Sequence, residues 1–377
     1  MGLKTINKDF LVKTLIKLVQ TPSLSSKEKE VAEKVSKILE DFGYRPKIDK
    51  YYDVIVEVGK GKKTILLNSH IDTVPPIGNW SINPYAGIVT NGKVYGLGAS
   101  DNKSGVAAMI EIARIFSFKP PNGKVIFLFT SREESDKDEA RKILIGKVKA
   151  NFGICLDHHI HAESKVADIV VGCRGIGNFT LKVYGKAYHS SEPEKAVNAI
   201  YRAISVVEAI RNAKLPLMLK PLKEKAVVSV TKINTDGWAT RIPDQCNLTI
   251  NYRALPKEKR EKAEKRIFKL VKETLKKDFN INLDSFHEGY LISLKHEIVK
   301  AAIKTVKQIK FKPKLSIAKG WVDAAFFNQM LGIPTICMGP GTQGQAHVKD
   351  EYEDIRNLYY GTLLVYKTVL NILGGEG

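Results

Sequence analysis

The sequence lacks several features that would have placed the chain in particular classes. No apolar run approaches the roughly 20 residues of a membrane-spanning helix, so no membrane span is predicted. The few cysteines, Cys155, Cys173, Cys246 and Cys337, stand far apart, which excludes a disulfide framework and a cysteine-type zinc site. The N-terminal segment has an amphipathic helical pattern without a cleavage site. We therefore expect a cytoplasmic protein without a signal peptide.

Acidic residues are also scarce, because 60 Lys and Arg face only 40 Asp and Glu, giving a net charge of +20. A positive charge of this size could indicate nucleic-acid binding. The lysines, however, are spread along amphipathic segments such as 257–277, and no RNA-binding motif of aromatic and basic residues is present. The pattern favours a solvated surface and argues against a nucleic-acid partner. The electrostatic field of a surface with this positive charge would still attract acidic substrates or an acidic protein partner.

Strand and helix patterns alternate over both ends of the chain. This alternation predicts an α/β domain with a mostly parallel sheet covered on both faces. The predicted strands are 54–58, 64–68, 124–131, 152–156 and 335–338. Between residues 178 and 286 the order changes to β-α-β-β-α-β, which is typical of a ferredoxin-like unit. We therefore predict a domain made of 1–173 and 288–377, interrupted by a smaller domain at 174–287.

Seven polar residues follow predicted strands of the interrupted domain. Since the carboxyl ends of parallel strands meet at one edge of a sheet, we expect their side chains to lie close together. Imidazole and carboxylate donors suit zinc or a similar divalent ion, and this number would suffice for two ions bridged by one carboxylate. The seven are His70, Asp72, Asp101, Glu133, Glu134, Asp157 and His347.

Several motifs resemble those of a known family. They are SHIDTVP at 69–75, YGLGASDNKSG at 95–105, the pair Glu133-Glu134, YGKAYHSSEPEKAVNAI at 184–200, and GPG, AH and DEY within 339–352. Together they resemble the co-catalytic zinc aminoacylase and carboxypeptidase family, which includes acetylornithine deacetylase and succinyl-diaminopimelate desuccinylase. The resemblance implies a zinc-peptidase-like catalytic domain interrupted by a ferredoxin-like lid and dimerisation domain.

The resemblance also implies a set of ligands for two divalent metal ions. The expected metal is zinc, for which cobalt can substitute. His70 and Asp157 would bind one ion, Glu134 and His347 the other, and Asp101 would bridge them. Relatives often have Glu-Pro where this chain has Asp157, followed by His158 and His159. His158 and His159 therefore remain alternative ligands.

Three further residues receive catalytic roles from the resemblance. Asp72 would accept the second ring N–H of His70 and fix its tautomer. Glu133 would be the general base for a water activated between the two ions, passing the proton to the leaving amine. His189, on the inserted domain, would stabilise the oxyanion, in the family often across a dimer.

The residues expected to recognise the substrate match the family's motifs less completely. Arg253 aligns with an arginine that holds the substrate carboxylate in relatives, a role that suits its forked guanidinium. The family's Gly-Thr-Ser-Asp loop, which begins here at Gly320, reads Gly-Trp-Val-Asp, and its usual Asn before Ile-Pro is replaced by Thr240. Trp321 would make this wall of the pocket more apolar.

The expected reaction is metal-dependent hydrolysis of the amide bond in an N-acyl amino acid by a homodimer. Within the same family, a dipeptidase, tripeptidase or carboxypeptidase acting on short peptides is an alternative. A hydrolase releasing lysine or ornithine from an acidic carrier protein would suit the positive charge, but its Gly-Arg-Gly-Ala-Val-Asp motif is replaced by residues 96–101. A protein of another class, an inactive binder, would have lost ligands that this chain retains.

Overall fold

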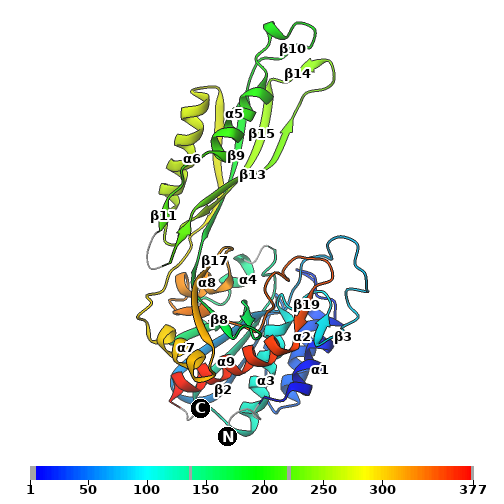
Figure 1. Ribbon diagram of the computed structural model, residues 1–377, viewed down its shortest axis with the longest axis vertical. Coiled ribbons are helices and arrows are strands. Elements are labelled where there is room, and N and C mark those ends of the chain that lie inside the picture. The colour runs from blue at the N-terminus through cyan, green and yellow to red at the C-terminus, as the bar shows by residue number, and fades with distance from the viewer. Residues whose placement is uncertain (1–5, 136–137, 219–221, 375–377) are drawn as a thin grey trace. The chain divides into compact units, whose positions relative to one another are not determined.

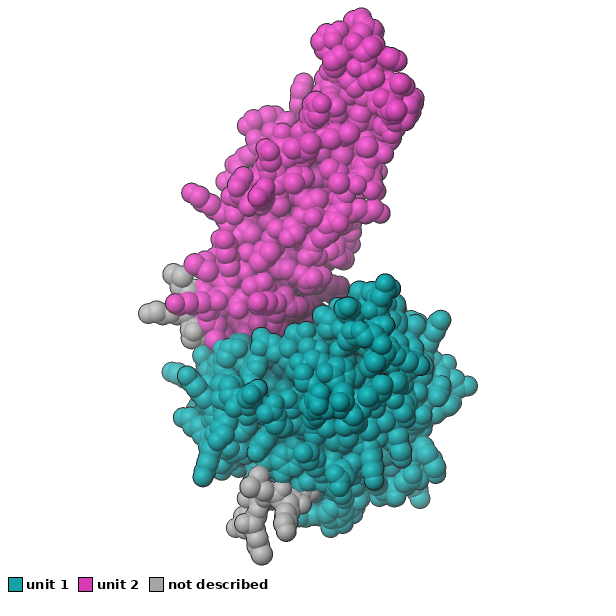
Figure 2. Space-filling view, turned by 45° about the vertical axis from the view of Figure 1, so that its right-hand side comes forward, with its two compact units in different colours: residues 1–171, 292–316, 322–377 teal, residues 172–291, 317–321 magenta. Residues whose placement is uncertain are grey.

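The computed structural model describes residues 6–135, 138–218 and 222–374. The chain divides into two compact units, coloured separately in Figure 2. Unit 1 comprises residues 1–171, 292–316 and 322–377, and unit 2 comprises 172–291 and 317–321. The assignment of a catalytic role to the first unit and of a lid role to the second stays a prediction.

Unit 1 is built on a central sheet with the strand order β1-β2-β6-β18-β8-β17, in which β5 also pairs with β2 and β7 with β8 (Figure 1). Neighbouring strands β2, β6 and β18 run parallel, and β8 runs antiparallel to β18. This largely parallel sheet confirms the predicted α/β class. Its strands are β1 Lys47–Ile48, β2 Val54–His70, β5 Asn122–Thr130, β6 Phe152–Cys155, β7 Ile160–His161, β8 Val166–Cys173, β17 Lys312–Ala318 and β18 Thr335–Cys337.

Strand β2 differs from its prediction as two separate strands. It is continuous, and both of its arms pair with β5. The first arm starts with Val54 opposite Phe129, and its partners in β5 then fall in number, so this arm runs antiparallel to β5. The second arm runs parallel to β5 and ends with His70 opposite Thr130. The exposed residues 60–63 lie between the two arms. Strand β5 therefore lies between the arms, and both β2 and β5 end where polar residues begin.

Two helices of unit 1 show features that the sequence pattern explains. Apolar residues of α2 recur on one face, at Val31, Val35 and Leu39, and are buried. Helix α9 is capped by the Asp354 carboxylate, which accepts from the Arg356 N–H, and ends at Gly374 in a left-handed conformation. Helices α3 and α9 pack on β2, and α8 packs on β6 and β18. The bounds are α1 Lys8–Val19, α2 Lys29–Glu40, α3 Lys103–Phe118, α4 Asp138–Lys142, α7 Glu297–Gln308, α8 Asp323–Gln329 and α9 Ile355–Leu373.

A small sheet joins segments of unit 1 that are distant in sequence. Its strand order is β19-β4-β3, with β3 Ile88–Thr90, β4 Lys93–Tyr95 and β19 Tyr352–Asp354. Tyr352 pairs with Tyr95, and the Gly96 N–H donates to the carbonyl oxygen of Glu351. The loop that carries Asp101 is thereby placed beside the C-terminal segment that carries His347.

Unit 2 contains a four-stranded antiparallel sheet with the order β13-β15-β9-β16. In the sequence its main elements follow the order β-α-β-β-α-β, which confirms the ferredoxin-like prediction. They are β9 Gly175–Tyr184, α5 Ala199–Arg211, β13 Val227–Thr235, β15 Gln245–Ala254, α6 Arg260–Leu275 and β16 Phe279–His287. Shorter elements are β10 Tyr188–His189, the 3-10 helix η1 Pro193–Lys195, β11 Leu217–Met218, β12 Glu224–Lys225 and β14 Arg241–Ile242.

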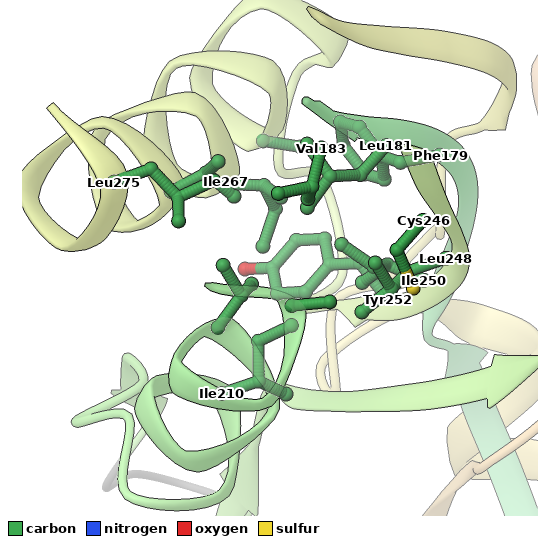
Figure 3. Packing of buried hydrophobic residues seen from close by; sticks show 14 of the residues in the cluster. Phe179, Leu181, Val183, Ile210, Cys246, Leu248, Ile250, Tyr252, Ile267 and Leu275 are labelled. Atoms are coloured by element: carbon green, nitrogen blue, oxygen red, sulfur yellow. The ribbon is translucent and has the colours of Figure 1, made fainter. Parts of the chain in front are cut away.

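The core of unit 2 lies between this sheet and its two helices. Alternate residues of β15 are buried, as expected for a strand with one face against helices. Figure 3 shows the ring of Tyr252 from β15 among Val183, Ile210 and Ile267. Its hydroxyl donates to the Glu258 carboxylate at 3.0 Å, so the one polar atom of this ring is satisfied. Across the described residues of both units, no helix combines the length and apolar character needed to cross a bilayer.

Candidate metal centre

The imidazole ring of His70 contacts Asp72 through Nδ1 and the carboxylate of Asp101 through Nε2. Its Nδ1 lies 3.0 Å from the backbone carbonyl oxygen of Asp72 and 3.4 Å from the Asp72 carboxylate. Its Nε2 lies 3.2 Å from Oδ1 of Asp101. Because a carbonyl oxygen can only accept, Nδ1 carries a proton. Nε2 is therefore the atom that would bind a metal ion, and Asp72 is the residue that fixes the ring orientation.

Asp101 lies between two groups of possible ligands. Donor atoms of His70, Asp101 and Asp157 lie within 4.8 Å of one another, and the same holds for Asp101, Glu134 and His347. On the second side, His347 Nε2 lies 2.9 Å from Glu134 and 3.6 Å from Oδ2 of Asp101. Five residues from five separate segments of unit 1 thus form two groups that share one carboxylate.

The chemistry of this donor set fits two divalent ions. Imidazole nitrogen and carboxylate oxygen are zinc ligands, and a shared carboxylate is the usual bridge between paired ions. Each group contains one imidazole, and Asp101 offers one oxygen to each side. We conclude that the residues present are suited to a dinuclear centre.

The charges in this region favour a cation. Burial acts to lower the pKa of His70, but its hydrogen bonds to Asp101 and Asp72 outweigh burial and raise that pKa above its usual value. The hydrogen bond to Glu134 raises the pKa of His347 to about 9. Burial opposes ionisation of Asp72, yet the hydrogen bond to His70 holds its pKa below the usual range. Both imidazoles therefore lie in a negative field of the kind that a bound cation would satisfy.

Asp72 also positions the adjacent glutamates at the end of β5. Its Oδ1 accepts from the Glu133 N–H and its Oδ2 from the Glu134 N–H, both at 3.0 Å. The Ser25 hydroxyl donates to Oδ2 as well, at 2.5 Å. One buried carboxylate thus holds both residues of this turn and the ring of His70. Donor atoms of His70, Glu133 and Glu134 also lie within 4.8 Å of one another, so Glu133 lies beside the centre.

A buried arginine supports the same turn from behind. Arg141 of α4 donates to both oxygens of Asp323 at 2.9 and 2.8 Å, and the Thr130 hydroxyl donates to the same carboxylate. Arg141 also approaches Asp53 at 3.6 Å, and Asp53 accepts from the N–H and hydroxyl of Ser131. These contacts fix Thr130 and Ser131, the residues that precede the turn.

Glu351 has a role that our sequence interpretation missed. Its side-chain oxygens accept the backbone N–H groups of Gly98, Ser100 and Asp101 at 2.8, 2.8 and 2.9 Å. It is buried and holds the loop from which the Asp101 side chain projects. The DEY motif drew attention to this position, but its spacing from the loop gave no sign of which backbone groups it would bind.

The remaining predicted residues belong to unit 2. His189 is exposed in β10, and its Nδ1 lies 2.7 Å from the Ser191 hydroxyl. Arg253 is partly buried in β15 and donates to the Asn251 side chain at 2.9 Å. Gly320 is exposed and precedes Trp321, whose indole N–H donates to the carbonyl oxygen of Glu288. These residues keep their predicted roles as proposals.

Comparison with known proteins adds a family and several relatives. The model of peptidase family M20/M25/M40 matches residues 66–371. A succinyl-diaminopimelate desuccinylase of Wolbachia pipientis wMel is 27% identical over 83% of this chain and 82% of its own length. An acetylornithine deacetylase of Aliivibrio fischeri MJ11 is 27% identical over 89% of this chain and 91% of its own. The crystal structure of aminopeptidase PepT from Bacillus cereus ATCC 10987 superposes with a TM-score of 0.81 at 25% identity, covering 98% and 99% of the two chains.

Proposed function

Because this chain belongs to peptidase family M20/M25/M40, and is thus a metallopeptidase-type hydrolase, we propose that it removes the acyl group from an N-acyl amino acid. The observation that carries the proposal is the position of Asp101, with one oxygen toward His70 and the other toward His347. A pair of divalent ions held there, with zinc as our choice, would lower the pKa of water from 15.7 to about 7 and polarise the amide carbonyl.

The chain's own groups would move the proton. Glu133 lies beside the centre, and its backbone N–H is fixed by Asp72. Its carboxylate would take the proton from the attacking water and deliver it to the amine nitrogen as the C–N bond breaks. The products are then a carboxylic acid and a free amino acid.

We propose that unit 2 supplies the remaining contacts. His189 would donate to the oxyanion, Arg253 would bind the substrate carboxylate, and the backbone at Gly320 would line the pocket. A homodimer would form through unit 2, where β13 is an edge strand and apolar side chains are exposed. They include Ile233, Tyr201 and Trp238, which are 48%, 70% and 65% exposed. A free strand edge with apolar neighbours is a typical surface for pairing with a second copy.

Metal removal and a substrate panel test this proposal. Chelation should abolish hydrolysis, and added zinc or cobalt should restore it, because water that is not bound to a metal ion stays protonated at neutral pH and is a weak nucleophile. The panel contains N-acetylornithine, N-succinyl-diaminopimelate, dipeptides, tripeptides and an acidic carrier protein with a lysine or ornithine cargo. Preference for the acyl amino acids by kcat/KM supports a deacylase. Preference for peptides would establish a peptidase, and no activity on any member after metal loading would contradict the enzyme assignment.

The role of His189 is tested by its replacement with alanine. His189→Ala should lower kcat by a factor of about 10²–10³, as loss of one oxyanion donor does elsewhere, with unchanged metal content. His296→Asn, which keeps a capping side chain at the start of α7, serves as the control and should leave kcat near that of the wild type. Wild-type turnover by His189→Ala would refute the proposed role.

A further inference from the structure

A second cluster of metal-binding side chains lies in unit 1, next to Asp157 in sequence, and shares no residue with the ligand groups at Asp101. Three histidines direct Nε2 toward the same carboxylate oxygen, Oδ2 of Asp168. Each of the three nitrogens lies 3.7 Å from that oxygen. Donor atoms of two of the histidines and Asp168 also lie within 4.8 Å of one another. The three histidines are His158, His159 and His161, of which the first two form the compact group.

Strand register brings these residues to one face. In the antiparallel pair β7–β8, Ile160 lies opposite Ala167 and His161 opposite Val166. The same register places residue 159 opposite 168, so His159, His161 and Asp168 lie on one face of the pair, since side chains alternate along a strand. The chain segment His158–His161 thus presents several imidazoles to one acidic side chain.

The separations are too long for hydrogen bonds and close to those of ligands around one ion. An N–H···O bond spans about 2.7–3.2 Å, so none of these three contacts is one. Ligands of a tetrahedral zinc with bonds of about 2.0–2.2 Å lie about 3.3–3.6 Å apart. The observed 3.7 Å therefore needs a contraction of only a few tenths of an ångström.

Asp168 is buried without a full set of partners. It is 3% exposed, and among the described residues its Oδ1 accepts no hydrogen bond. Lys314 of β17 donates a hydrogen bond to Oδ2 at 3.4 Å and also lies 3.2 Å from Oδ1, but the lysine side chain is 54% exposed. A pair with such an exposed partner contributes little, and the lysine can turn into solvent when another cation is present.

We propose that His158, His159, His161 and Asp168 bind a third divalent ion of the zinc type, separate from the ions at Asp101. Three imidazoles and one carboxylate form a donor set that zinc, cobalt, nickel and copper ions accept. The ion would link the segment after β6 to the β7–β8 pair. The proposal rests on this cluster alone and holds whatever substrate the enzyme uses.

Metal stoichiometry of the whole chain tests the proposal. Equilibrium dialysis against Zn²⁺ should give three ions per wild-type chain, and His161→Ala and Asp168→Asn should each weaken the third at least tenfold. Lys314→Met should tighten it, because a competing cation is removed. His287→Ala, outside the cluster, should leave the count at three. Equal zinc binding, in number and affinity, by the wild-type chain, His161→Ala and Asp168→Asn would overturn the proposal.

Two further measurements separate this site from the dinuclear centre and from misfolding. Asp101→Ala, which breaks both groups at Asp101, should still bind one Co²⁺ with the strong visible absorption of tetrahedral cobalt. If only the dinuclear proposal is wrong, Asp101→Ala will match the wild type in metal count while Asp168→Asn still loses an ion. Anomalous scattering at the zinc edge from wild-type crystals should show a peak between Asp168 and the histidines. Peaks at Asp101 alone would refute the third site without any variant.

Discussion

Glu133→Gln is expected to bind its metal ions with wild-type stoichiometry while kcat falls by a factor of about 10²–10⁴. Glutamine has nearly the same size, so the backbone N–H of residue 133 can still donate to Asp72, and the turn can persist. The amide cannot accept the proton from water, so the step that generates the nucleophile is lost. Steady-state kinetics and metal analysis on the same preparation measure the two effects separately.

The adjacent residue provides the matched control. Glu134 lies 2.9 Å from His347 and belongs to one of the two ligand groups at Asp101. Glu134→Gln should therefore lower the metal content as well as kcat, because a neutral amide replaces a charged ligand. Metal loss in Glu133→Gln together with full metal content in Glu134→Gln would show that the roles of the two glutamates are exchanged.

Arg141→Met should lower the free energy of unfolding by about 3–5 kcal/mol, the usual cost of removing one partner from a buried ion pair. The arginine side chain is 1% exposed, and its loss leaves the carboxylates of Asp323 and Asp53 buried without their cation. Methionine fills a similar volume, so the effect would come from charge and hydrogen bonding and not from a cavity. Urea-induced unfolding followed by circular dichroism measures the change.

Two companion variants identify the cause. Lys142→Met changes the next residue of α4, whose pair with Glu139 is exposed to solvent, and should shift the unfolding midpoint far less. Arg141→Met combined with Asp323→Asn removes one of the stranded charges and should recover part of the loss. Equal destabilisation by Lys142→Met, or no recovery in the double variant, would mean that the buried ion pair is not the source of stability.

Much of the candidate centre could be predicted because polar residues at the ends of strands must meet. His70 ends β2, Glu133 and Glu134 follow β5, and Asp157 follows β6. The parallel arrangement of these strands brings their ends to one edge, so the pattern of apolar run followed by polar residue was sufficient. Asp101 and His347 were predicted at the same edge from the same pattern, although both lie on loops, and the motif resemblance implied their separate roles as bridge and terminal ligand.

The rest depends on contacts that local patterns do not encode. The sequence shows a turn between the two arms of β2. It does not show that β5 lies between these arms, because that arrangement depends on pairing with a distant segment. The histidines at 158, 159 and 161 were visible as well. Asp168 lies in an apolar strand, and the β7–β8 register places it on the same face as His159 and His161. Arg141 of the short helix α4 is buried against Asp323, which lies 182 positions away in the sequence.

The anchoring of the Asp101 loop by Glu351 has a consequence for synthesis of the protein. The two residues are separated by 250 positions, and His347 also comes from this late segment. While the ribosome is still making the last part of the chain, the loop at 98–101 therefore lacks the carboxylate that orders its backbone. The nascent chain can form β2 and β5 early, but it cannot complete the centre before translation has nearly ended. The donor group of Asp101, Glu134 and His347 can therefore assemble only after the group of His70, Asp101 and Asp157 has been synthesised.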